Sequence, residues 1–249
     1  MSFEKMRVGQ DDDVRSTQST IEMYDLAGKE DDRRISPFCW RIRLALAHKG
    51  LLVRSIPWRL TEKDVIGRFG ATSVPVIVDH GQAVSDSWEI AVYLDKKYPS
   101  RPLFDSPQAK AYAFWFHNWT ERSLHPLIVP LILEEVLLHL HEKDLAFFRL
   151  SRERAFGKPL EAVMDRTEVA FGRLEKALSP TRRTLAQNPF LAGEQPAYAD
   201  YTLFGAFQWA RCCSSQNLIR SKSDPIQAWL ARMLDLYDGL ARNTIGYPV

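Results

Sequence analysis

Residues 74–94, VPVIVDHGQAVSDSWEIAVYL, carry the pattern that decides the fold. The apolar run that begins at Val74-Pro75 predicts a buried strand, and His80-Gly81 predicts a turn into a second short strand. Ser87 can cap a helix, because a hydroxyl accepts well from an amide of the first turn and apolar residues then recur at helical spacing. The stretch therefore predicts a strand, a turn, a second strand and a helix.

The residues before this stretch predict two more strands that flank a helix. Ile21–Leu26 predicts the first strand. Ser36-Pro37 predicts the start of a helix, since Ser is favoured at the N-cap and Pro at the first helical position. Leu51–Trp58 is apolar and β-branched, and the proline within it indicates an edge strand. With a short helical piece after it, the order over residues 21–100 is β-α-β-α-β-β-α, which fits one small domain.

The residues after this domain predict helices only. Several prolines indicate a linker just after residue 98, and no strand pattern follows it. Apolar residues at helical spacing from Leu160 to Leu178 predict one helix, and those from Tyr201 to Trp209 predict another. We therefore expect a polar N-terminal arm over residues 1–20, an α/β domain over residues 21–100 and an all-α domain over residues 107–249.

The composition excludes several classes of protein. The chain has 249 residues, a formal net charge of +2 and three cysteines. Near-neutral charge argues against nucleic acid or an anionic membrane as a partner, and so few cysteines argue against a disulfide framework. The first 20 residues lack the apolar run of a signal peptide, and no stretch is apolar enough to span a membrane. We expect a cytoplasmic protein with a small-molecule substrate and no metal site, since the six histidines lack metal-ligand spacing.

Ser36 is the first candidate for chemistry. Besides capping its helix, its hydroxyl lies where it can donate a hydrogen bond to a bound thiolate at the positive end of the helix dipole. Lowering the pKa of an ordinary thiol, about 8.5, by about two units takes about 2.7 kcal/mol. A hydrogen bond to a charged group supplies about 1.5–3 kcal/mol and a helix N-terminus about 0.3–1 kcal/mol, so one serine at one helix end suffices.

Cys39 is a second candidate. It comes three positions after Ser36 and completes a C-x-x-C redox spacing whose first cysteine is replaced by serine. Two interpretations of Cys39 remain open: a reactive thiol and a small buried residue of the helix.

Two dipeptides are candidates for holding an extended peptide ligand. A cis bond at Val74-Pro75 would present the amide and carbonyl of Val74 to a ligand as an added strand partner. Asp86-Ser87 comes at the start of the next helix, where Ser87 and nearby amides suit a carboxylate and Asp86 suits an ammonium. Each dipeptide is common by itself, so the prediction depends on their occurring in order after Ser36.

In this order, Ser36-Pro37, Val74-Pro75 and Asp86-Ser87, followed by an all-α domain, resemble the glutathione transferases. The resemblance spans about residues 21–239 and implies a thioredoxin-like first domain, glutathione as cosubstrate and a homodimer. It implies that Ser36 is catalytic through the glutathione thiolate, that Val74 and Pro75 hold the cysteinyl part, and that Asp86 and Ser87 hold the γ-glutamyl end. Asp86 stands where the family more often has Glu. The aspartate side chain is shorter, so it reaches less far toward the γ-glutamyl end.

A second stretch, residues 191–201 (LAGEQPAYADY), resembles the family's approach to the buried helix of its α domain. Asp200 matches the acid of a capping box that helps nucleate folding there, and Ala197 replaces the usual capping side chain. This similarity implies a structural role for Asp200.

Four segments look like the bacterial β-etherases of lignin breakdown and the related fungal transferases: residues 35–50, 74–79, 86–95 and 235–240. Those enzymes use the glutathione thiolate to displace an aryloxide from the side-chain β carbon, next to a ketone, and the resemblance implies that reaction for this chain. The electrophile is expected in the cleft between the domains, over the start of the first helix. The aromatic candidates for its walls, with core packing as the alternative, are Phe38, Trp40, Trp115, Phe116 and Trp119.

Two other functions remain open at this point. One is a glutathione-binding protein of the same fold that lacks a productive electrophile pocket, and the other is a thiol oxidoreductase that uses Cys39. Around the proposed thiolate site of the transferase, we expect a cationic cluster that would attract anionic glutathione. Its members are Arg33, Arg34, Arg41 and Arg43.

Overall fold

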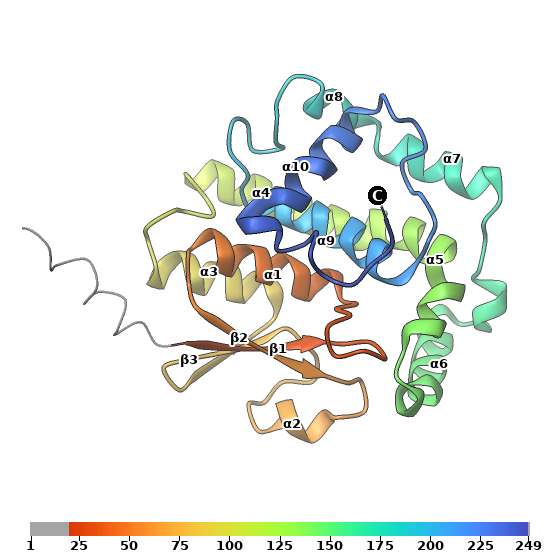
Figure 1. The fold of residues 1–249 in the computed structure, drawn as a ribbon, viewed down its shortest axis with the longest axis horizontal. Coiled ribbons are helices and arrows are strands. Elements are labelled where there is room, and N and C mark those ends of the chain that lie inside the picture. Colours follow the sequence, from red (N-terminus) through yellow and green to blue (C-terminus); the bar gives the residue numbers. More distant parts are fainter. Residues whose placement is uncertain (1–19, 249) are drawn as a thin grey trace, which may run out of the picture.

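A mixed four-stranded sheet with helices on both sides forms the first domain (Figure 1). The computed structural model describes residues 20–248, so the predicted arm over residues 1–20 lies, except for Thr20, outside the described residues. The elements are β1 (Ile21–Leu26), α1 (Pro37–His48), β2 (Val53–Trp58), α2 (Lys63–Gly67), β3 (Val76–Asp79), β4 (Gln82–Ser85) and α3 (Ser87–Lys97). This order confirms the predicted thioredoxin-like fold.

The sheet has the strand order β2-β1-β3-β4. β1 pairs in parallel with β2 and antiparallel with β3, and β3 and β4 form an antiparallel hairpin. β2 lies at an edge, as the proline within it indicated. α1 and α3 lie on the face of the sheet that is turned toward the helical domain, and α2 lies on the other side (Figure 1). The start of α1 is thereby held between the sheet and the second domain.

The second domain is helical, as predicted, and its described residues contain no strand beyond one isolated bridge between Phe190 and Gly193. It consists of α4 (Pro107–Trp119), the π-helical η2 (Thr120–Leu124), α5 (His125–His139), α6 (Glu142–Phe156), the 3-10 helix η3 (Leu160–Ala162), α7 (Glu168–Ala177), α8 (Ser179–Leu185), α9 (Tyr198–Cys213) and α10 (Pro225–Gly239).

The predicted single helix from Leu160 to Leu178 is wrong, because η3 and α7 are separate helices. Between them, Oδ1 of Asp165 accepts from the amide and the hydroxyl of Thr167 at 3.0 and 2.6 Å. Thr167 in turn caps α7 by accepting from the amide of Ala170. Such local side-chain bonds offer the backbone an alternative to the helix, which hydrophobic spacing alone does not detect.

Asp200 organises the start of α9 from a fully buried position. Its carboxylate accepts from the amides of Leu191 (2.7 Å), Ala192 (3.3 Å) and Ala197 (3.1 Å) and from the indole of Trp229 (2.9 Å). The bond from Ala197 is the half of the capping box expected from the sequence, and the methyl side chain of Ala197 cannot supply the other half. One carboxylate thus ties the loop before α9 to α10.

Gly205 lets α9 come close to the first turn of α1. A Cβ at this position would overlap the carbonyl oxygen of Pro37, which is a backbone atom that no side-chain rotation can move aside. The first turn of α1 is therefore set directly against the helical domain.

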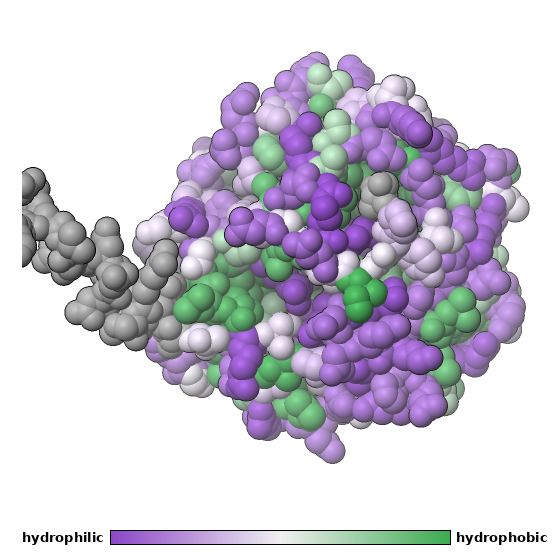
Figure 2. Space-filling model, in the orientation of Figure 1, coloured by the Kyte–Doolittle hydropathy of each residue, from purple (hydrophilic) through white to green (hydrophobic). Residues whose placement is uncertain are grey.

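No helix within residues 20–248 is long and apolar enough to cross a membrane. The face of the molecule in Figure 2 is largely hydrophilic, and its apolar residues form several separate patches.

Replacing Gly205 with alanine tests the contact between the two helices. Gly205→Ala is expected to lower the free energy of unfolding by about 1–3 kcal/mol, because overpacking outweighs the better helix propensity of alanine. Gly172→Ala in α7 is the matched control, since nothing lies within 4 Å of the added Cβ, and it is expected to raise the free energy by up to about 1 kcal/mol. Denaturant unfolding measures both, and equal effects at the two sites would contradict the close contact.

Candidate functional site

Two cavities meet at the N-terminus of α1, between the domains. The first, which we call the polar cavity, has a volume of about 370 Å³ and is lined by Ser36, Val74, Pro75, Asp86 and Ser87. The five residues predicted to bind a peptide ligand therefore lie around one space. The rest of its lining comes from Leu26, Phe38, Trp58, Leu60, Lys63, Ser73, Phe147, Ser151 and Arg152.

Ser36 is the N-cap of α1, as predicted. Its backbone is extended, Pro37 follows at the first helical position, and its Oγ accepts from the amide of Cys39 at 3.2 Å. A hydroxyl has two lone pairs and one proton, so this capping bond leaves the proton available to a ligand. Ser36 is only 4% exposed, yet it lines both cavities.

The peptide bond between Val74 and Pro75 is cis. The pairing of β3 with β1 ends at Val76, opposite Tyr24, so Val74 lies beyond the end of this ladder and lines the polar cavity. Its backbone is accordingly in a position to pair with an extended ligand.

Asp86, and not Ser87, is the N-cap of α3, which corrects the sequence prediction. Asp86 has a left-handed backbone (φ 72°), and its Oδ1 accepts from the amides of Trp88 (2.8 Å) and Glu89 (3.1 Å). Ser87 becomes the first helical residue and is buried. The carbonyl of Ser87 accepts from the hydroxyl of Tyr198 at 2.8 Å, which joins this corner of the site to α9.

The cations that line the polar cavity are Lys63 and Arg152, not the four arginines expected from the sequence. Those four do not line it but form ion pairs: Arg33 with Glu30, Arg34 and Arg43 with Asp25, and Arg41 with Glu121. Of the four, Arg41 reaches the site from behind, since its Nη1 also donates to Oγ of Ser87 at 3.5 Å. Nearness in sequence to Ser36 does not bring a side chain to the cavity, because Arg33 and Arg34 precede α1 and the side chains of Arg41 and Arg43 within it point to different faces. Lys63 in α2 and Arg152 in α6 are far from Ser36 in sequence, and only the fold brings them to it.

The second cavity, which we call the apolar cavity, has a volume of about 340 Å³. It shares Leu26, Ser36, Phe38, Leu60 and Arg152 with the polar cavity. The remaining walls are Ile35, Pro37, Glu121, His125, Pro126, Val129, Ile132, Leu133, Val136, Leu140, Phe148, Ala155, Phe156 and Trp209.

Of the five aromatic residues predicted for this pocket, the structure places only Phe38 in its walls. Trp40 is fully buried in the core, where its indole donates to the carbonyl of Arg34 at 2.9 Å. The other three lie on α4 away from the cavity: Trp115 is 60% exposed, and the rings of Phe116 and Trp119 pack on each other at 5.2 Å. The walls come instead largely from α5, whose sequence HPLIVPLILEEVLLH is apolar on nearly every side and could have indicated this role.

A buried polar network lies behind Phe38. Arg41 is fully buried, and its Nη1 donates to Nδ1 of His117 (2.9 Å) and to Oε1 of Glu121 (2.8 Å). Nε2 of His117 lies 2.9 Å from the same Oε1, which fits the tautomer with its proton on Nε2. Burial opposes ionisation of Glu121, but the bond from His117 and the charge of Arg41 prevail and lower its pKa to about 2. Burial and the charge of Arg41 also lower the pKa of His125 to about 3, so this imidazole is neutral at physiological pH.

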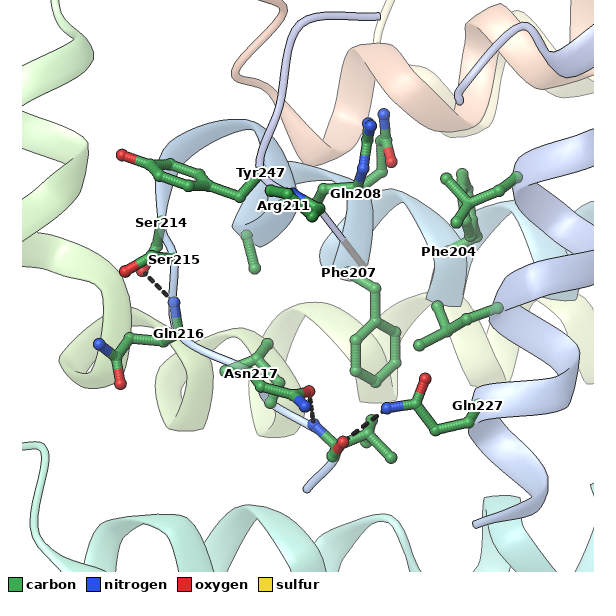
Figure 3. A pocket seen from close by; sticks show the side chains of 16 residues that line it. Phe204, Phe207, Gln208, Arg211, Ser214, Ser215, Gln216, Asn217, Gln227 and Tyr247 are labelled. Atoms are coloured by element: carbon green, nitrogen blue, oxygen red, sulfur yellow. Dashed lines mark hydrogen bonds between the residues drawn. The ribbon is translucent and has the colours of Figure 1, made fainter. Parts of the chain in front are cut away.

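Another, smaller cavity lies between α9 and α10 (Figure 3). It has a volume of about 130 Å³, and its lining includes Gln208, Arg211 and Tyr247. None of the predicted site residues contributes to it, so we assign the site to the polar and apolar cavities.

Models of two protein-family domains match the chain. Residues 35–97 match the family described as glutathione S-transferase, N-terminal domain, and residues 111–236 match glutathione S-transferase, C-terminal domain. The chain belongs to the glutathione S-transferase family.

Curated members of the family align with part of the chain. The glutathione S-transferase-like protein ustS of Aspergillus flavus is 30% identical over 146 residues, which cover 51% of this chain and 50% of that protein. Glutathione S-transferase Z1 of Arabidopsis thaliana is 41% identical over 70 residues, which cover 25% and 31%. The chain thus spans half or less of the length of these relatives.

Solved glutathione transferases align over nearly the whole structure. Glutathione transferase GSTFuA2 of Phanerochaete chrysosporium has a TM-score of 0.79 and 26% identity, and the alignment covers 88% of this chain and 98% of that one. A glutathione S-transferase of Ceriporiopsis subvermispora, solved in complex with glutathione, has a TM-score of 0.78 and 24% identity over 88% and 97%.

Cys39 is not accessible in this family member. The side chain is fully buried, and burial raises the pKa of its thiol well above the ordinary range. Since the thiolate is the reactive form, both effects oppose a role as nucleophile. Cys212 and Cys213 are buried as well.

Alkylation of the native protein tests this conclusion. Cys39 is expected to stay unmodified by iodoacetamide in native buffer and to react fully after denaturation, as read by peptide mass spectrometry. A glutathione adduct on Cys39 after treating native protein with oxidised glutathione would contradict it and would favour the oxidoreductase alternative.

Proposed function

We propose that the chain is a glutathione transferase in which Ser36 stabilises the glutathione thiolate and the apolar cavity holds an aromatic or other hydrophobic electrophile. The observation that carries this proposal is the position of Ser36, which lines both the polar and the apolar cavity. A nucleophile bound at Ser36 would face an electrophile across a short distance, and such proximity is a large part of the rate enhancement of two-substrate enzymes.

The polar cavity offers partners for the charged groups of glutathione. Its γ-glutamyl ammonium is proposed to bind Oδ2 of Asp86, because both capping bonds of Asp86 use Oδ1. The neighbouring carboxylate is proposed to bind Ser87 at the start of α3. Its cysteinyl backbone would pair with Val74, and Lys63 supplies a cation for the glycyl carboxylate.

Ser36 would stabilise the thiolate with the proton that its capping bond leaves over. Its hydrogen bond to a charged sulfur contributes about 1.5–3 kcal/mol, and the first turn of α1, which contains no acidic residue, adds about 0.3–1 kcal/mol. The two contributions together are enough to lower the thiol pKa by two units, which requires about 2.7 kcal/mol. The thiol proton passes to solvent, and the sulfur then attacks with its lone pair.

The finer proposal is cleavage of β-aryl ethers. The thiolate forms a C–S bond at the side-chain β carbon, next to the ketone carbon, while the C–O bond breaks, and the aryloxide leaves with the electron pair and then takes a proton. The similarity in four segments to the β-etherases supports this reaction, and the apolar cavity of about 340 Å³ beside Ser36 supports an aromatic substrate.

We also propose a cytoplasmic homodimer. The three unpaired thiols fit a reducing compartment. The exposed aromatic side chains of α4, which include Phe114 and Trp115, supply apolar surface for a partner copy.

Removing the hydroxyl of Ser36 tests its role. Ser36→Ala is expected to lower kcat/KM at pH 7 by about 10- to 100-fold toward a general aryl halide electrophile, because one hydrogen bond to a charged group is lost. Its pH–activity midpoint should move to higher pH, since more alkaline solution is then needed to form the thiolate. Ser36→Thr keeps both the hydroxyl and the cap and is the matched control.

The stability of these variants is measured in parallel, because Ser36→Ala also loses an N-cap worth about 1 kcal/mol. Unchanged activity of a folded Ser36→Ala protein toward every accepted electrophile would remove the assigned role.

A glutathione-dependent screen with product masses tests the reaction class. A β-aryl ether ketone is expected to give equal amounts of a glutathione thioether and a free phenol. Turnover of aryl halides alone would retain the transferase and reject ether cleavage. Glutathione binding in a calorimeter without turnover of any electrophile would instead favour the non-catalytic alternative.

A further inference from the structure

Glu121 brings a negative charge into the wall of a largely apolar cavity. It lies in the π-helical turn η2, and its side chain is 30% exposed. The charged side chains among the cavity's lining residues are Glu121 and Arg152, and most of the others are aliphatic or aromatic. An ion is costly in such surroundings unless it is paired, so its presence calls for a reason.

One oxygen of Glu121 is already used. Both the bond from Arg41 (2.8 Å) and the contact with Nε2 of His117 (2.9 Å) go to Oε1. Arg41 and His117 are themselves buried, so they hold the carboxylate in one orientation. Oε2 takes part in neither contact, so it is the oxygen that remains for a ligand of the cavity that Glu121 lines.

The charge of Glu121 is set by the same partners. Its pKa of about 2 keeps it ionised across the physiological range, against the effect of burial. It therefore accepts hydrogen bonds and does not donate them. The neighbouring His125 also lines the cavity and is neutral, so it does not offset this charge.

We propose that Glu121 is a specificity-determining residue that selects electrophiles carrying a hydroxyl or another hydrogen-bond donor, above all phenolic aromatics, and disfavours analogues in which that hydroxyl is methylated or replaced by a carboxylate. This inference rests on the proposed function, since it assigns the substrate class of the same apolar cavity. A site built to bond a substrate hydroxyl rejects the analogue that lacks it, because the buried polar group is then left unpaired.

Arg152 would favour anionic ligands, whereas Glu121 would repel them. Arg152 lines the same cavity, and an aromatic carboxylate could pair with it. The order in which hydroxyl, ether and carboxylate analogues bind therefore shows which of the two charges governs selection.

The test uses three matched ligands, 2-naphthol, 2-methoxynaphthalene and 2-naphthoate, bound to the wild-type protein saturated with glutathione. Calorimetry or fluorescence gives the three dissociation constants at pH 7. We expect 2-naphthol to bind at least about 10-fold more tightly than 2-methoxynaphthalene, as one hydrogen bond to a carboxylate allows. Equal binding of these two, or tightest binding of 2-naphthoate, would overturn the proposal.

Glu121→Gln sharpens the test, because its expected effect is a loss of selectivity. The amide oxygen of Gln would replace Oε1 toward Arg41 and His117, which turns the NH₂ group into the cavity in place of Oε2. A donor then stands where an acceptor stood, so the advantage of 2-naphthol over the ether should disappear. A variant that folds and keeps the full advantage would overturn the proposal.

The matched control is Glu134→Gln on α5, which breaks a surface ion pair with Arg166 and leaves the cavity intact. It should keep the wild-type order of ligands. If Glu121→Gln does not fold because Arg41 loses its counter-charge, the wild-type series still decides the matter.

The proposed function and this inference fail in different ways. Absence of any glutathione conjugate would contradict the transferase reaction but leave the ligand order intact. A normal rate of conjugation with no preference for the hydroxyl would contradict only the role of Glu121.

Discussion

The close contact between the first turn of α1 and α9 determines where the site lies. Because Gly205 has no side chain, α9 approaches the carbonyl of Pro37 directly, and the N-terminus of α1 is fixed between the sheet and the helical domain. Ser36, which precedes that turn, consequently borders both the polar cavity and the apolar cavity. Tyr198, near the start of α9, bonds the carbonyl of Ser87 and so positions a second corner of the same site.

Ligand binding at the site depends on polar side chains that use one hydrogen-bonding position within the protein and keep another for the ligand. The hydroxyl of Ser36 accepts from the helix and keeps its proton, and Asp86 caps α3 with one oxygen. Glu121 likewise gives one oxygen to Arg41 and His117. In each case one part of the group is held by the protein, which orients the other part without a further loss of side-chain entropy on binding.

Much of the fold and of the polar cavity could be predicted from the sequence, because the signals there are local. Ser36-Pro37 marks a helix start, Pro57 marks an edge strand, and the order of elements in the first domain follows from apolar runs and turns. The break before α7 was missed because it depends on hydrogen bonds of Asp165 and Thr167 that no hydrophobic period reveals.

The apolar cavity could not be predicted in the same way. Its walls come from helices that are distant in sequence, and aromatic character alone pointed to Trp40 and Trp115, of which one is buried in the core and the other is exposed on α4. Arg41 lies only five residues from Ser36 in sequence, yet its side chain pairs with Glu121 and does not line the polar cavity. Pairing across the domain interface is a tertiary property that spacing does not encode.

The central claim is that Ser36 and the first turn of α1 lower the pKa of bound glutathione. A titration of the thiolate absorbance of glutathione bound to the protein measures this most directly, with Ser36→Ala beside the wild type. We expect the thiol of the wild-type complex to titrate about two units below the ordinary value of about 8.5, and that of the variant to return most of the way toward it. Equal titration in the two folded, glutathione-bound proteins would contradict the account.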